Sequence, residues 1–275
     1  TSFNQDISSW NLSIITDMRG MFKGATSFNQ DLSSWDVSSA LFMTDMFLDA
    51  NALSDANKCA IHLSFSSNDA WPYDWSGLCF QPQDSAELQT AVDMWVDDNE
   101  SALSTYGEIN TWDVSLITSM NSLFYGTAFN DDISSWDVSN VIDMGAIFQT
   151  TSSFNQDISG WNVSNVTNMA SMFQHANSFN GDISSWDVSS TTNMADMFMN
   201  ASNFNQDLSS WDVSSVITMR NMFRNVESFN QDISDWDVGS VGNMQGMFQN
   251  ATSFNQDLSS WDVSSVATMA YMFEN

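Results

Sequence analysis

Apolar residues recur along this chain at fixed distances from a tryptophan, with a period of about 25 residues. Ile or Leu stands three residues before each of these tryptophans, Met stands eight residues after it, and Phe stands twelve residues after it. The nine tryptophans that anchor the pattern are Trp10, Trp35, Trp112, Trp136, Trp161, Trp186, Trp211, Trp236 and Trp261. A fixed period of roughly 20–50 residues is typical of stacked-repeat proteins. The pattern therefore predicts stacked coils whose apolar rows form the interior.

Each repeat contains two short segments with different local patterns. Asp-Ile-Ser-Ser-Trp-Asp-Val has β-branched and aromatic residues at its apolar positions and polar turn formers around it, which favours a short strand in a parallel ladder. Val-x-x-Met-x-x-Met-Phe places apolar residues at i, i+3, i+6 and i+7, which favours a short helical or 3₁₀ turn. The Asn of Phe-Asn-Gln-Asp is expected to hydrogen-bond the backbone of the neighbouring coil and so to form an Asn row.

The period breaks once, which divides the chain. We expect the end of a first repeat array at 1–50, an irregular disulfide-closed C-terminal cap at 51–83, a helical N-terminal cap at 84–108, and a second array of seven repeats with an open end at 109–275. Within the second cap, residues 84–98 are predicted to be helical, because Asp84 and Glu87 resemble a capping box before an apolar face. A shorter helix is expected to stop at Gly107.

The methionine and tryptophan rows are interpreted as core. The methionine eleven residues after Trp is replaced by Leu123 in one repeat and by Ile147 in the next, so the position requires apolar shape rather than sulfur. This exchange argues against a soft-metal site. An indole edge that stays accessible for stacking on a sugar is the alternative for the tryptophans.

The charge balance excludes some partners. The chain has 34 acidic and 5 basic residues and a net charge of −29. Nucleic acids and anionic membranes both require Lys and Arg, so neither is expected as a partner. No apolar run approaches the roughly 18 residues that a membrane span needs.

Cysteines and glycosylation motifs favour an oxidising compartment. The only two cysteines, Cys59 and Cys79, lie in the non-repeat stretch, and a disulfide between them would close a loop of about 20 residues. Six Asn-x-Ser/Thr sequences are candidate N-glycosylation sites: Asn11, Asn99, Asn162, Asn165, Asn200 and Asn250.

Two acidic rows are the strongest candidates for a metal site. One stands four residues before Trp, and in the second array it contains Asp132, Asp157, Asp182, Asp207, Asp232 and Asp257. The other stands one residue after Trp and contains Asp137, Asp187, Asp212, Asp237 and Asp262. Stacking would place like charges about 4.8 Å apart. Three roles remain open: carboxylates that cap turn amides, a Ca²⁺ row, since Ca²⁺ takes oxygen ligands, or a direct partner surface.

Enzyme chemistry is not expected. The two histidines, His62 and His175, are isolated in the sequence, and there is no nucleophile elbow, phosphate loop or Cys/His metal spacing. Carboxylates are so frequent that pairs of them carry no information about catalysis. No cofactor other than Ca²⁺ is anticipated.

The repeats resemble those of the BspA-like leucine-rich-repeat surface proteins, including lipoprotein repeats of unknown function. The matching segments are Trp-Asp-Val-Ser-x-Val-x-x-Met-x-x-Met-Phe and Phe-Asn-Gln-Asp-Ile-Ser. The resemblance implies a leucine-rich-repeat-like right-handed β-solenoid, with one short parallel strand and one short helical turn per repeat. It also implies an extracellular or cell-surface setting and a role in adhesion or matrix binding, with no catalytic residues.

The expected function is therefore an extracellular structural or adhesive protein that binds other proteins or matrix. The alternative is a module that binds Ca²⁺ or glycan. The last residues continue the phase in which the first residues begin, so two alternatives are open: the chain is a stretch of a longer array, or copies meet head to tail in a filament.

Overall fold

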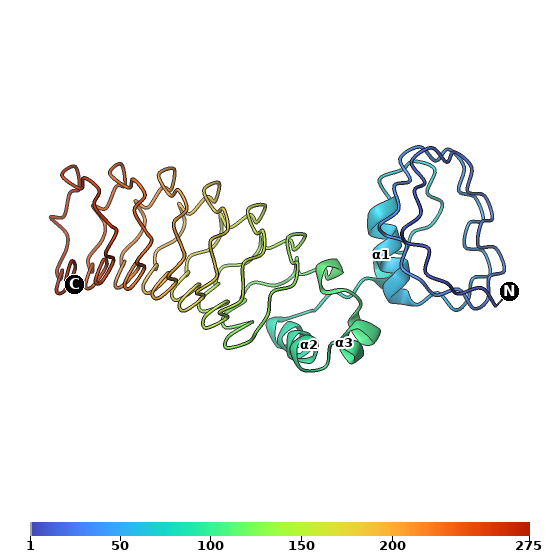
Figure 1. The fold of residues 1–275 in the computed structure, drawn as a ribbon, viewed down its shortest axis with the longest axis horizontal. Coiled ribbons are helices and arrows are strands. Elements are labelled where there is room, and N and C mark those ends of the chain that lie inside the picture. The colour runs from blue at the N-terminus through green and yellow to red at the C-terminus, as the bar shows by residue number, and fades with distance from the viewer. Residues whose placement is uncertain (1) are drawn as a thin grey trace. The chain divides into compact units, whose positions relative to one another are not determined.

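The computed structural model describes residues 2–275. The chain forms two compact units. The first consists of Thr1–Gln81 and Asp98–Asp113, and the second of Pro82–Asp97 and Val114–Asn275. In the second unit, the coils follow one another side by side from green to red in Figure 1. The boundaries that we drew at residues 50, 83 and 108 remain predictions.

Helices occur only between the two repeat arrays in the described part of the chain. They are α1 (Asp55–Phe65), α2 (Ser85–Asp97) and α3 (Asn99–Tyr106), with 3₁₀ turns η1 (Ser76–Leu78) and η2 (Ile109–Thr111). The Ser54 side chain caps α1 by accepting a hydrogen bond from Asn57 N, and the Asp98 side chain caps α3 by accepting one from Ser101 N. Gly107 ends α3 with φ of +76°, a conformation that glycine adopts without steric cost.

The expected β-solenoid is wrong. Residues 2–275 contain no β-strand, and η2 at the start of the second array is the only helical turn within the described repeats. Neighbouring coils are joined by isolated parallel bridges at the position seven residues after Trp: Asp17–Phe42, Ser119–Asp143, Asp143–Asn168, Asn168–Asn193, Asn193–Thr218, Thr218–Asn243 and Asn243–Thr268. The strand content that the resemblance implied therefore does not describe this chain.

Tight turns explain why neither element forms. In the predicted strand, the Trp186 amide bonds back to Ile183 O, and the Thr191 amide bonds back to Val188 O, so the backbone reverses twice. In the predicted helical segment, Ser171 and His175 have φ of +58° and +59°. Residues ten and fourteen after Trp have positive φ in coil after coil, which interrupts a right-handed helix at every fourth residue.

The backbone between coils is nevertheless fully hydrogen-bonded along this segment. Alternate amides of one coil donate to the next coil: Met169 N to Asn193 O, Ser171 N to Ala195 O, Phe173 N to Met197 O, and His175 N to Met199 O, at 2.8–2.9 Å. The amides of Met172, Gln174 and Ala176 donate within their own coil. The chain thus satisfies its buried amides without a sheet.

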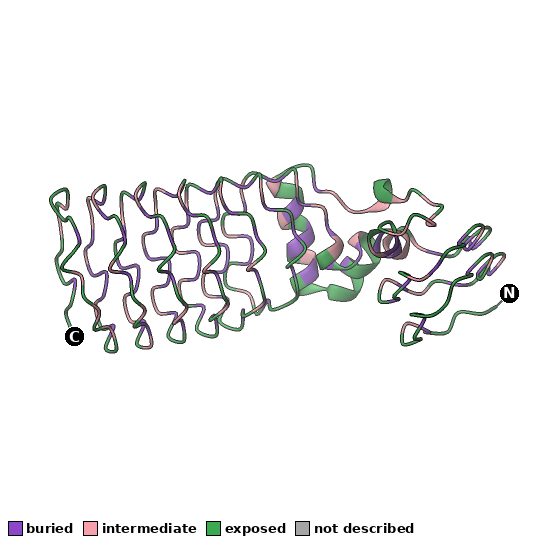
Figure 2. Ribbon diagram, turned by 90° about the horizontal axis from the view of Figure 1, so that it is seen from above, coloured by how far each residue is buried: buried purple, intermediate pink, exposed green. Residues whose placement is uncertain are grey.

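Aromatic rows fill the interior, as the sequence pattern predicts. Rings of Phe148, Phe173, Phe198, Phe223 and Phe248 stack with centroids 5.6–5.7 Å apart. Each is at most 2% exposed, and full burial of a Phe side chain stabilises the fold by roughly 1.5–3 kcal/mol. Figure 2 shows buried and exposed segments alternating along each coil. The replacements Leu123 and Ile147 are buried in the same core, which agrees with the interpretation of that row as apolar packing.

The Asn row also forms. The amides of Asn180, Asn205 and Asn230 each donate to the side-chain Oδ1 of the Asn 25 residues earlier, at 2.9 Å. Each side chain therefore replaces a backbone acceptor of the neighbouring coil, as the sequence suggests.

The segment after the first array continues its rows without being a repeat. The Ser54 amide donates to Asn29 Oδ1, as the next member of the Asn row would. The Ser64 hydroxyl of α1 donates to Ser33 O. The Tyr73 hydroxyl accepts a hydrogen bond of 2.8 Å from Phe47 N. In the coil before, the equivalent amide Phe22 N donates to a backbone carbonyl of the following coil, Met46 O. Tyr73 thus takes the place of that carbonyl.

In the second unit, α2 occupies the place of a preceding coil. The Ser85 hydroxyl donates to Ser119 O at 2.6 Å, and the Gln89 amide donates to Leu123 O at 3.1 Å. In later coils, carbonyls at these two positions accept backbone amides of the coil before. Two side chains one helical turn apart thus substitute for missing backbone donors.

Candidate binding surfaces

The acidic rows lie at turns. The carboxylate Oδ1 of Asp182 accepts the Ser184 amide at 2.9 Å, and that of Asp187 accepts the Ser189 amide at 3.1 Å and the Ser189 hydroxyl at 2.6 Å. The same Asp-to-serine contact two residues ahead occurs at Asp132, Asp137, Asp157, Asp207, Asp212, Asp232, Asp257 and Asp262, and at Asp237 with Gly239 as donor. This geometry favours turn capping among the three roles.

The turn contacts also lower the pKa of many of these carboxyls. The pKa of Asp212 lies below its usual value, chiefly because the Ser214 hydroxyl bonds to it and secondly because the Ser214 amide does. At Asp207 the Ser209 amide is the main cause of the lowered pKa, and the charges of Asp182 and Asp232 act in the opposite direction. Neighbouring carboxylates in a row therefore repel one another weakly while remaining ionised.

No group of three or more His, Cys, Asp or Glu residues within residues 2–275 is arranged to hold a metal ion. The structure brings carboxylates of successive coils into rows but does not gather them around a centre. The Ca²⁺ row remains a hypothesis.

The inner tryptophans offer a ligand little surface. Trp35, Trp112, Trp136, Trp161, Trp186, Trp211 and Trp236 are each 3% exposed. Their indole nitrogens are also in use: Trp161, Trp186 and Trp211, for example, each donate to a carbonyl of the preceding coil. The core interpretation of this row agrees with these contacts.

The predicted disulfide is present. Cys59 of α1 and Cys79, which follows η1, are bonded with an S–S distance of 2.03 Å. Near it, the ring nitrogen Nδ1 of His62 accepts the Trp71 indole N–H at 3.1 Å, and Trp71 packs edge-on against Phe65. The irregular segment is therefore a closed aromatic cap.

The candidate glycosylation sites differ in how their amides are used. Asn162 is exposed, and its Oδ1 accepts the Ser164 amide and hydroxyl. The side-chain nitrogens of Asn165 and Asn250 already donate to Ser139 O and Asn225 Oδ1, and that of Asn200 contacts His175 Nε2. Asn11 forms the same turn as Asn162, and Asn99 begins α3. Glycosylation itself remains a prediction.

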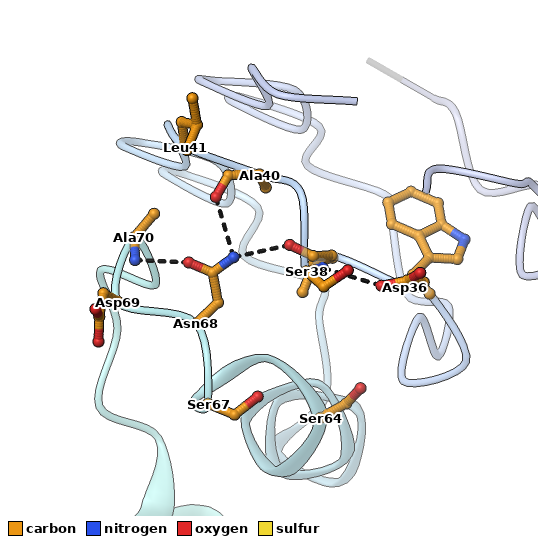
Figure 3. A pocket seen from close by; sticks show the side chains of 11 residues that line it. Asp36, Ser38, Ala40, Leu41, Ser64, Ser67, Asn68, Asp69 and Ala70 are labelled. Carbon is orange, nitrogen blue, oxygen red and sulfur yellow. Dashed lines mark hydrogen bonds between the residues drawn. The ribbon is translucent and has the colours of Figure 1, made fainter. Parts of the chain in front are cut away.

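A polar groove lies between the last coil of the first array and the end of α1 (Figure 3). Its volume is about 750 Å³, and its lining includes Asp36, Ser38, Leu41, Ser67, Asn68 and Asp69. The Asn68 side chain reaches the coil and donates to Val37 O at 2.8 Å and to Ala40 O at 3.0 Å. Its Oδ1 accepts the Ala70 amide, which fixes the turn that forms one wall.

A second surface differs from coil to coil. Positions nine, ten and thirteen after Trp in the second unit form what we call the variable face, in which Gly145, Asp196, Asn221 and Gly246 are buried and the other members are partly or fully exposed. They adjoin one another: Arg220 pairs with Asp196 of the preceding coil, and a Cβ on Gly246 would lie 3.5 Å from Gln249. Its members are Asn121, Ser122, Tyr125, Gly145, Ala146, Gln149, Ala170, Ser171, Gln174, Ala195, Asp196, Met199, Arg220, Asn221, Arg224, Gln245, Gly246, Gln249, Ala270, Tyr271 and Glu274. No two coils carry the same three residues.

Sequence reasoning missed both surfaces. The groove depends on how α1 and its following turn meet a coil, and no local pattern reports that contact. The variable face corresponds to positions that have no preferred residue in the aligned repeats, and a pattern of recurring residues does not indicate them.

These features define a stacked-repeat protein with an aromatic core and side-chain caps. The chain belongs to the family described as "Mycoplasma protein of unknown function, DUF285", which matches residues 1–64, 93–208 and 181–275. The match establishes the repeat family and does not establish membership in the narrower BspA-like group. No curated protein and no solved structure matches the chain. Within residues 2–275, no helix is both long and apolar enough to span a membrane.

Proposed function

We propose that this chain is an extracellular structural or adhesive repeat protein that binds another protein or a matrix component through the variable face. The observation that carries the proposal is that some positions of the repeat keep the same residue from coil to coil, whereas others change. The acidic turns and the core keep nearly the same residue in every coil, whereas the variable face presents a different set in each.

A surface that repeats the same side chain cannot distinguish one position of a partner from another. The variable face can, because its residues differ in charge, size and hydrogen bonding along the stack. It also carries Arg220 and Arg224, the only Lys or Arg residues in the sequence of the second unit. Arginine and tyrosine are frequent among residues that contribute most to binding.

The disulfide and the resemblance to BspA-like surface proteins support an extracellular setting. A disulfide such as Cys59–Cys79 persists in oxidising compartments and is rare in reducing ones. The net charge of −29 keeps such a chain soluble through self-repulsion.

The test is binding of the purified chain to immobilised fibronectin, laminin, collagen and the chain itself, measured by biolayer interferometry. We expect saturable binding to at least one of them, weakened by the double variant Tyr125→Ala/Gln174→Ala. The matched control is Ser215→Ala/Ser240→Ala, two exposed serines of the second unit that lie outside the variable face. Binding that is absent throughout, or that both variants weaken equally, would contradict the proposal.

A further inference from the structure

The groove of the first unit lies where a further coil would otherwise pack. In the second unit, the residue six after Trp donates its amide to the equivalent carbonyl of the preceding coil: Thr167 N to Ile142 O at 2.8 Å, and Thr192 N to Thr167 O at 2.9 Å. The side chain four after Trp donates to the carbonyl three after the preceding Trp, as Asn165 does to Ser139 O. We call the segment from Trp to the sixth residue after it the corner of a coil. These contacts join the corners of successive coils.

At the corner that begins with Trp35, the same bonds are incomplete. Leu41 N donates to Thr16 O, and the Ser39 hydroxyl donates to Ser13 O, so this corner is joined to the coil before it. On its other side, no residue in the described range 2–275 donates to Leu41 O or to Ser38 O. Two backbone acceptors thus stand at the groove where another coil would bring donors.

The charge of the groove selects the chemistry of an occupant. Asp36 and Asp69 line it as exposed carboxylates, and no Lys, Arg or His is among its lining residues. Leu41, a residue that is 64% exposed, adds an apolar contact. A volume of about 750 Å³ lies within the range of ordinary ligand sites.

Other occupants fit less well. A second copy of this chain would bring a net charge of −29 to an acidic groove. A sugar would find no stacking platform, because Trp35 is 3% exposed. An extended polypeptide brings regularly spaced amide donors, and main-chain hydrogen bonds of this kind give affinity in peptide recognition.

We infer that this groove binds a basic segment of a partner polypeptide, which donates a backbone amide to Leu41 O and places Lys or Arg side chains at Asp36 and at Asp69, which line opposite ends of the groove (Figure 3). The site is separate from the variable face. The inference therefore stands or fails independently of the proposed function.

The test begins with a random heptapeptide library displayed on phage and selected on the full chain. Enriched peptides are synthesised with a fluorescent label, and their affinities are measured by fluorescence polarisation. Ser67→Trp fills the groove at a side chain that makes no hydrogen bond in the described structure. Leu63→Trp adds the same ring at an exposed position outside the groove and is the control.

We expect enriched peptides to contain Lys or Arg and to bind Ser67→Trp about tenfold or more weakly, a change of about 1.4 kcal/mol. Leu63→Trp should bind like the unchanged chain. Asp36→Asn/Asp69→Asn should weaken binding and reduce its salt dependence. N-methylation of the peptide at one backbone position should abolish binding, because it removes the amide that meets Leu41 O.

Three results would overturn the inference: no peptide is enriched, the enriched peptides bind Ser67→Trp unchanged, or N-methylation has no effect at any position. Saturable binding of a neutral oligosaccharide that Ser67→Trp blocks, without peptide binding, would also overturn it. Thermal melting of each variant by circular dichroism shows whether the fold is retained.

Discussion

The indole Nε1 of Trp186 donates a hydrogen bond of 3.1 Å to Ile158 O in the preceding coil. The bond recurs from Trp161, Trp211, Trp236 and Trp261 at 3.0–3.2 Å. The tryptophan row therefore joins coils by directed hydrogen bonds as well as by packing. A phenylalanine at this position would fill much of the same space but would lack the donor.

Trp186→Phe should destabilise the fold by about 0.5–1.5 kcal/mol, because it removes one of the two donors to the Ile158 carbonyl, which keeps its hydrogen bond from Trp161 N. Urea unfolding followed by circular dichroism measures the change. Trp10→Phe is the control, because Trp10 is 51% exposed. Equal midpoints for the unchanged chain and Trp186→Phe would show that the row acts by packing alone.

Tyr73→Phe should lower stability by about 0.5–1.5 kcal/mol, because it removes the acceptor for Phe47 N. The same ring change at Tyr125, which is 55% exposed, should have little effect. Thermal melting of both variants makes the comparison. A loss as large in Tyr125→Phe as in Tyr73→Phe would contradict the role of Tyr73 as a cap.

Acid should destabilise the chain. The lowered pKa of Asp187, Asp207 and Asp212 in the folded state means that folding favours their ionised forms. The stabilisation is present above the unfolded pKa of about 3.9 and is lost as the pH falls through the folded values. The melting temperature should therefore fall as the pH drops below about 4.

Asp187→Asn/Asp212→Asn should flatten that pH dependence, because an amide oxygen still accepts the serine amides but does not titrate. A melting temperature that is unchanged down to pH 2, or the same slope in the variant, would argue against this account.

Ca²⁺ should have little effect on stability. The Oδ1 atoms of Asp182 and Asp207, for example, already accept serine amides. We expect the same melting temperature with millimolar Ca²⁺ and with EDTA, and no saturable heat in a calorimetric titration. A rise in melting temperature that depends on Ca²⁺, and that Asp182→Asn/Asp207→Asn abolishes, would instead establish the Ca²⁺ row.

Some local interactions could be predicted from single positions. The Asn row and the pairing of Cys59 with Cys79 were both expected and are present. The groove was not, because its walls come from Leu41 and Asn68, which no periodic pattern connects. In the described structure, Leu41 O and Ser38 O accept no hydrogen bond, and this is recognised only by comparing the corner at Trp35 with corners against which another coil packs.

The sequence by itself determined the repeat, its period and its interior, because only residues that return at fixed spacing can form continuous rows. It did not determine the backbone conformation. The segment ending in Met172 and Phe173 has helical spacing, yet positive φ at Ser171 and His175 bends it into turns. The tertiary structure decided this, because packing each coil on the next satisfies alternate amides across the stack and removes the need for either a strand or a helix.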